Sequence, residues 1–77
     1  MPITPFLAGK AFEPELIREM SLALETVCEK FGMNLADDPA TRVLASKIIE
    51  VAQRGARGTF ISEMTITELK HYHLPNA

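Results

Sequence analysis

Apolar side chains recur every three or four residues in the first half of the chain. This period predicts a helix from about Pro14 to Phe31. Proline suits the first helical position because its missing N–H would have no partner there. Gly32 can adopt the left-handed conformation that ends a helix. The apolar stripe of this helix consists of Leu16, Ile17, Met20, Ala23, Leu24, Val27, Cys28 and Phe31.

The same period predicts a second helix from about Pro39 to Arg54. Asp38 is a favoured N-cap residue, because its carboxylate accepts a hydrogen bond from a backbone N–H of the first turn. Gly55 can terminate the helix. Small residues on the apolar face allow this helix to approach the first one closely. That face carries Ala40, Thr41, Leu44, Ala45, Ile48, Val51 and Ala52.

Residues 59–72 have a less regular pattern. Thr59 can cap a helix here, whereas Thr65 and Glu68 match a capping box that would start it later. The threonines also raise strand propensity, so a short strand is the alternative. Because a lone strand would have no partner strand, we predict a helix. Its apolar side would carry Phe60, Ile61, Met64, Leu69 and Tyr72.

Together these elements predict an all-α fold, a small three-helix bundle with an extended N-terminal arm. Residues 1–12 form the arm, because two prolines and a glycine oppose regular structure there. Residues 13–74 form the single helical domain and residues 75–77 a frayed C-terminus. Phe6 and Leu7 of the arm could dock on the bundle or on a second subunit, and the chain entropy lost on docking opposes it.

Composition and charge narrow the class of protein. The 77 residues are 47% hydrophobic with a net charge of −2, which is typical of a globular domain. The negative charge argues against a general binder of nucleic acid or anionic membranes. No apolar run approaches the ~20 residues of a membrane span, and a signal peptide is not evident. A single cysteine excludes an internal disulfide, so we expect a cytoplasmic protein.

The residue types that carry catalysis or bind metals form no recognised constellation. The Asp37-Asp38 pair is interpreted as part of a helix cap. His71 and His73 would point to different faces of a helix, so they do not chelate one ion there. Cys28 lies on the apolar stripe and is expected to be buried. We therefore predict no catalytic residues, no metal ligands, no cofactor and no enzymatic activity.

A small basic group is the basis of one functional alternative. Arg54 and Arg57 flank a glycine-containing turn, and Lys70 follows on the third segment. These residues could serve an accessory nucleic-acid-binding protein. Basic residues at a helix C-terminus are also what the helix dipole favours, and we prefer that interpretation.

Two apolar residues fall on the polar faces of the predicted helices. Leu22 lies among charged residues of the first helix and Val43 among those of the second. Together with a small core and the arm residues Phe6 and Leu7, they suggest self-association, with a two-fold homodimer the commonest form. The leading functional hypothesis is therefore a small protein–protein interaction or regulatory module that acts through its helix faces.

The order of motifs along the chain resembles that of small uncharacterised bacterial helical proteins. The motifs are Phe12-Glu13-Pro14-Glu15, a long helix, Ile48-Ile49-Glu50-Val51-Ala52 and the turn Arg54-Gly55-Ala56-Arg57. In that family a helix beginning "F-D-P-E" leads to a second helix closing on "I-I-E-L-A…G-E-R" and a short third helix. The resemblance covers about residues 12–70. It departs at residues 56–59, where the family has an acidic, proline-containing cap. It implies a bacterial three-helix protein and brings no activity or cofactor.

Overall fold

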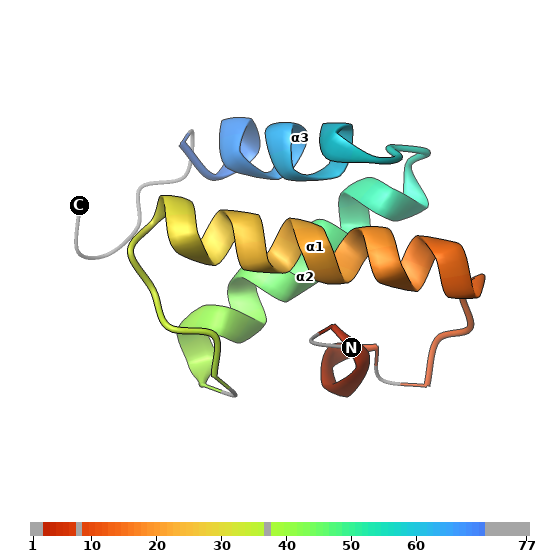
Figure 1. The fold of residues 1–77 in the computed structure, drawn as a ribbon, viewed down its shortest axis with the longest axis horizontal. Coiled ribbons are helices and arrows are strands. Elements are labelled where there is room, and N and C mark those ends of the chain that lie inside the picture. The colour runs from red at the N-terminus through yellow and green to blue at the C-terminus, as the bar shows by residue number, and fades with distance from the viewer. Residues whose placement is uncertain (1–2, 8, 37, 71–77) are drawn as a thin grey trace.

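The computed structural model describes residues 3–7, 9–36 and 38–70, and three α-helices make up most of them (Figure 1). A short 3-10 helix, η1 (Thr4–Phe6), precedes α1 (Pro14–Lys30), α2 (Pro39–Gln53) and α3 (Thr59–Lys70). α1 and α3 lie side by side and run in the same direction, while α2 passes behind α1 in the opposite sense. Each helix packs on the other two. The predicted all-α three-helix bundle is confirmed.

The ends of α1 and α2 follow the sequence signals closely. Gly32 adopts a φ of 67°, and the Met33 N–H donates to the Cys28 carbonyl oxygen at 2.8 Å. This bond satisfies a carbonyl that would otherwise lack a helical partner. α2 ends in the same way, with the Ala56 N–H donating to the Val51 carbonyl oxygen at 3.1 Å. Both helices end one residue before the predicted position, so the glycine signals located their ends well.

The start of α2 is capped as predicted. Oδ1 of Asp38 accepts a hydrogen bond from the Thr41 N–H at 2.8 Å. The hydrogen bond from the Thr41 backbone N–H is the main cause that lowers the pKa of Asp38. The neighbouring Asp37 lies outside the described residues. Asp38 therefore contributes an N-cap, and its carboxylate is held in the charged form by that role.

The N-terminal segment docks on the bundle instead of extending away from it. η1 contacts α2, and Ile3 is fully buried, with 0% of its surface exposed. The Ile3 N–H donates to Oγ of Ser21 on α1 at 3.3 Å. Leu7 is also buried, and Phe6 is partly buried against the core. The sequence left open whether this segment docks, and in the structure it packs against the bundle.

The buried face of α3 differs from the predicted one. Phe60 was expected among the core residues, yet 57% of its surface is exposed. The face is centred on Thr65, with Ile61 and Leu69 four residues away on either side. At 100° per residue Phe60 falls on the far side of the helix from Thr65. The helix itself is confirmed from Thr59 to Lys70, and Tyr72 lies outside the described residues.

One core position offers a stabilising substitution. Thr65 is fully buried, and its Oγ1 has no hydrogen-bond partner. Valine has the same shape without the hydroxyl, so Thr65→Val is expected to raise the free energy of unfolding by about 1 kcal/mol. Thr67→Val, at an exposed position of the same helix, is the matched control and should change it by less than about 0.5 kcal/mol. Urea denaturation measures both. A destabilised Thr65→Val variant would show that the hydroxyl has a partner.

Candidate functional site

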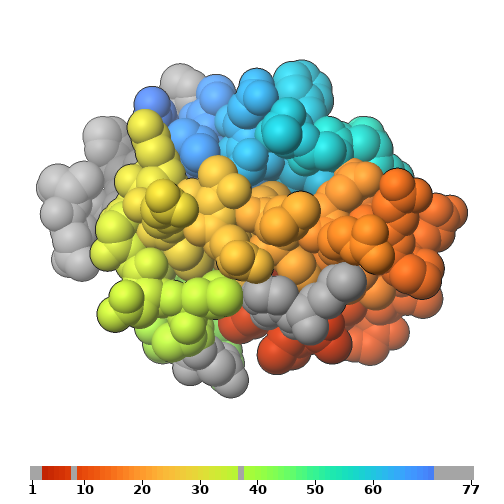
Figure 2. Space-filling view, in the orientation of Figure 1, coloured from red at the N-terminus to blue at the C-terminus, as the bar shows by residue number. Residues whose placement is uncertain are grey.

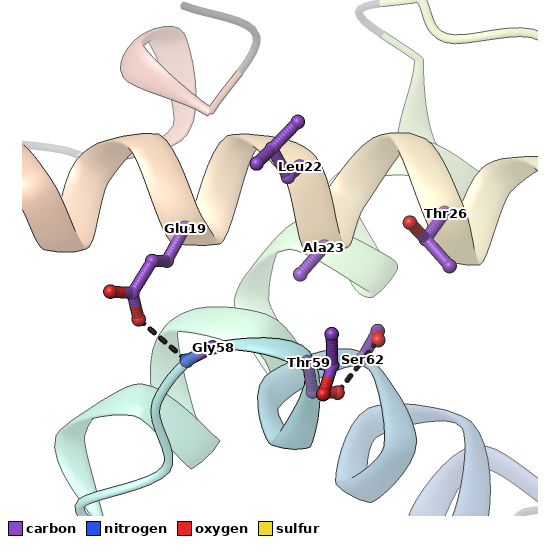
Figure 3. Close-up of a pocket in the computed structure, with 7 residues that line it drawn as sticks. All are labelled: Glu19, Leu22, Ala23, Thr26, Gly58, Thr59 and Ser62. Carbon is purple, nitrogen blue, oxygen red and sulfur yellow. Dashed lines mark hydrogen bonds between the residues drawn. The ribbon is translucent and has the colours of Figure 1, made fainter.

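A shallow groove separates the middle of α1 from the start of α3 (Figure 3). Its volume is about 160 Å³ and its surface is mostly carbon. The outer side of α1 is exposed across the front of the molecule, between α3 above and the N-terminal segment below (Figure 2). The groove is lined by Glu19, Leu22, Ala23, Thr26, Gly58, Thr59 and Ser62.

Leu22 forms the outer rim of this groove. Its side chain stands away from α3, whereas Ala23 and Thr26 lie on the α3 side (Figure 3). It is 57% exposed, because it lies opposite the buried residues of α1, such as Met20 and Leu24. The sequence pattern predicted this exposed apolar position. The groove beside it was not predicted, because it depends on how α3 packs.

Glu19 joins the two walls of the groove. Its Oε1 accepts a hydrogen bond from the Gly58 N–H at 2.6 Å (Figure 3). Gly58 directly precedes α3, so the carboxylate satisfies a free N–H at the positive end of that helix. Within α3, Oγ of Ser62 donates to the Thr59 carbonyl oxygen at 2.9 Å. Sequence analysis missed the role of Glu19, because Glu19 and Gly58 are 39 positions apart.

The three basic candidates lie in different surroundings. Nη1 of Arg57 donates to the carbonyl oxygens of Ala52 at 2.9 Å and Ala56 at 2.7 Å, at the C-terminal end of α2. Arg54 forms an ion pair with Glu68. Lys70 is exposed in the last turn of α3, roughly 18 Å along the helix from its start. Arg57 therefore has the C-terminal role that the helix dipole favours.

An ion-pair network connects α2 to α3. Glu68 contacts Arg54 and also Lys47, whose Nζ lies 3.3 Å from Glu68 Oε1. Lys47 Nζ is in addition 2.8 Å from Oε2 of Glu50. The hydrogen bond from Arg54, and then that from Lys47, lower the pKa of Glu68. This network explains why a glutamate lies on the side of α3 that faces α2.

The lowered pKa of Glu68 makes stability depend on pH. The folded-state pKa is below its ordinary value of 4.5, so its contribution is present above that value and is lost as the pH falls through the folded-state pKa. Between pH 7 and pH 3, Glu68→Gln should lose less stability than the wild type. Glu63→Gln, on the same helix and without an ion pair among the described residues, is the control and should retain the wild-type profile. Urea denaturation at several pH values distinguishes them; coincident profiles for wild type and Glu68→Gln would contradict the prediction.

Other candidates from the sequence are placed as follows. Cys28 is buried in the core, as predicted, and burial, with a smaller effect of the Asp38 charge, raises the pKa of its thiol. A raised pKa disfavours the thiolate that a nucleophilic cysteine needs. Val43 is 53% exposed on α2, outside the groove. His71 and His73 lie outside the described residues. Sequence analysis did not single out the exposed Leu35.

Metal-ligating side chains, membrane-spanning helices and known relatives add little to the description of this site. No group of three or more metal-ligating side chains occurs in the part of the chain that the structure describes. Among those same residues, the helices are too short or too polar to cross a membrane. No family model, curated protein or solved structure matches the chain. The resemblance to bacterial helical proteins therefore stays a prediction.

Proposed function

We propose that this protein is a small protein–protein interaction module whose binding surface is the outer side of α1 together with the α1–α3 groove. The observation that carries the proposal is Leu22, a large apolar side chain that is 57% exposed on the rim of an apolar groove. An exposed apolar side chain alone is ordinary, but an adjoining concave apolar surface marks interaction sites more often. The partner is a second copy of the chain or another protein of the cytoplasm.

The dimensions of the groove favour a protein partner over a small-molecule substrate. Its volume of about 160 Å³ is below the ~300–1,000 Å³ of usual ligand pockets. It opens to solvent beside Leu22, so an apolar side chain of a partner helix can insert into it, a common mode of recognition between helices. Binding would remove Leu22 and the carbon surface of the groove from water, which is the main favourable contribution to association.

The test is a capture experiment with tagged protein and lysate of the source cells, with and without nuclease, read by mass spectrometry. The wild type is expected to retain a specific protein after nuclease treatment, and Leu22→Glu is expected to lose it. Val43→Glu is the matched control, because it places the same charge at an equally exposed apolar position on another helix. Equal recovery by Leu22→Glu and wild type, or recovery of nucleic acid alone, would contradict the proposal.

A further inference from the structure

Among the described residues that line the α1–α3 groove, one, Glu19, is charged. The wall that α3 and the residue before it contribute consists of Gly58, Thr59 and Ser62 and carries no charge. The hydrogen bond from the Gly58 N–H holds the Glu19 carboxylate in place through Oε1. The second oxygen, Oε2, points away from Gly58 and accepts no hydrogen bond from the part of the chain that the structure describes (Figure 3). The groove therefore has a fixed carboxylate with one oxygen open to a donor.

Glu15 extends the acidic end of the groove. At 100° per residue, Glu15 and Glu19 both fall on the side of Leu22 that faces α3, about 11 Å and about 5 Å before it along the helix axis. They are one turn apart and carry like charges, so a cation placed between them removes an unfavourable contact. Arg57, beside Gly58 in the chain, instead donates from Nη1 to carbonyl oxygens at the end of α2. Neither glutamate takes part in an ion pair within the described ranges.

The outer side of α1 is acidic over its whole length. Within about 60° of Leu22 around the helix, the charged residues are Glu15, Arg18, Glu19, Glu25 and Glu29. Their net charge is −3, whereas that of the entire chain is −2. This surface therefore repels the phosphate groups of nucleic acids and of anionic membranes, and it repels the same surface on a second copy of the chain. A partner with basic side chains has the complementary charge.

We propose that the partner of the groove is a basic amphipathic helix of another protein. An apolar side chain of that helix fills the groove beside Leu22, and a lysine or arginine about one turn away pairs with Glu15 and Glu19. This proposal rests on the proposed function and names the chemistry of its partner. The spacing is one turn because Glu19 and Leu22 are three residues apart on α1. A carboxylate that is already held in place loses little conformational entropy on binding, so its ion pair adds to the apolar contact.

A designed peptide tests this chemistry by nuclear magnetic resonance titration of the full chain. The probe is an alanine-rich helical peptide with a leucine at its centre and a lysine one turn to each side, so that it fits the groove in either direction. It should shift the amide resonances of Glu19, Leu22 and Thr59, and its affinity should fall as salt is added. A peptide with glutamates in place of the lysines should bind about tenfold more weakly, because like charges then meet at the groove. A peptide with alanine in place of the leucine should also lose affinity.

Charge-neutral variants of the protein locate the contact. Glu15→Gln/Glu19→Gln should weaken binding of the lysine peptide about three- to tenfold, in the range of two exposed ion pairs. Glutamine keeps an oxygen that accepts from the Gly58 N–H, and circular dichroism verifies that the variant folds. Glu13→Gln/Glu63→Gln is the matched control, because it removes the same charge from exposed positions that do not line the groove. This control should bind the lysine peptide like the wild type.

The outcomes separate this proposal from the proposed function. Absence of binding at millimolar peptide, equal affinities for the lysine and glutamate peptides, or equal losses in the two double variants each overturn the basic partner. Groove resonances that shift with protein concentration alone would show a second copy in the groove and overturn it as well. In each of these cases the proposed function stands if Leu22→Glu still abolishes capture of a protein from the lysate. It fails separately if Leu22→Glu captures that protein as the wild type does.

Discussion

Leu24→Ala is expected to unfold a large fraction of the protein at room temperature. Leu24 is fully buried in the core, and removing a buried leucine side chain costs about 2–5 kcal/mol through lost burial and the cavity left behind. A single core in a chain of this length rarely supplies more than about 3–5 kcal/mol in total. The expected loss is therefore comparable with the whole free energy of unfolding.

Leu22→Ala provides the matched control, since it makes the same chemical change two residues away on the same helix at an exposed position. It should alter the free energy of unfolding by less than about 0.5 kcal/mol. Urea denaturation followed by circular dichroism, at a concentration low enough to keep the protein monomeric, measures both variants. Equal effects of the two substitutions would show that Leu24 is not the core residue described above.

Ile3→Ala is expected to have the second largest effect, with a loss of about 2–4 kcal/mol, in the range found for buried isoleucines. The residue precedes any regular helix, yet its side chain is fully buried and its N–H is bound to Ser21. The free energy of unfolding lost in Ile3→Ala cannot exceed the free energy with which the N-terminal segment docks, because a detached segment has nothing further to lose. If that segment detaches, the folded state buries less surface, and the denaturant m-value falls as well.

Thr4→Ala is the neighbouring control for Ile3→Ala, because the Thr4 side chain is exposed. It should leave both the midpoint and the m-value of the urea transition close to those of the wild type. If Ile3→Ala behaves like Thr4→Ala, the N-terminal segment contributes no measurable stability to the bundle.

The features predicted well from the sequence are those determined by neighbouring residues. The cap at Asp38 and the glycine that ends α1 act within a few positions of the chain, so their residue types alone located the helix ends. The exposed position of Leu22 followed from the 3.6-residue period in the same way. Local pattern was thus sufficient for the fold class and for one residue of the candidate site.

The features that could not be predicted depend on contacts between distant segments. The burial of Ile3 depends on how η1 docks on the bundle, and two prolines nearby indicated only irregular structure. Glu68 lies on the side of α3 that faces α2, where the apolar pattern would place a hydrophobic residue. Only its ion pairs with Lys47 and Arg54 of the neighbouring segment explain this position. The groove itself exists only because α3 packs along α1, which no local pattern specifies.

The contact between Glu19 and Gly58 has a consequence for how the chain folds. A helix of 12 residues such as α3 is marginal in isolation, because the first turn costs more conformational entropy than its hydrogen bonds return. Here part of that first turn is completed by a side chain of α1, so α3 gains a cap only once α1 has formed and the two have met. A fragment that begins after α1, or a peptide of residues 59–70 alone, would lack this cap. The contact therefore couples the last helix to the first in a single cooperative transition.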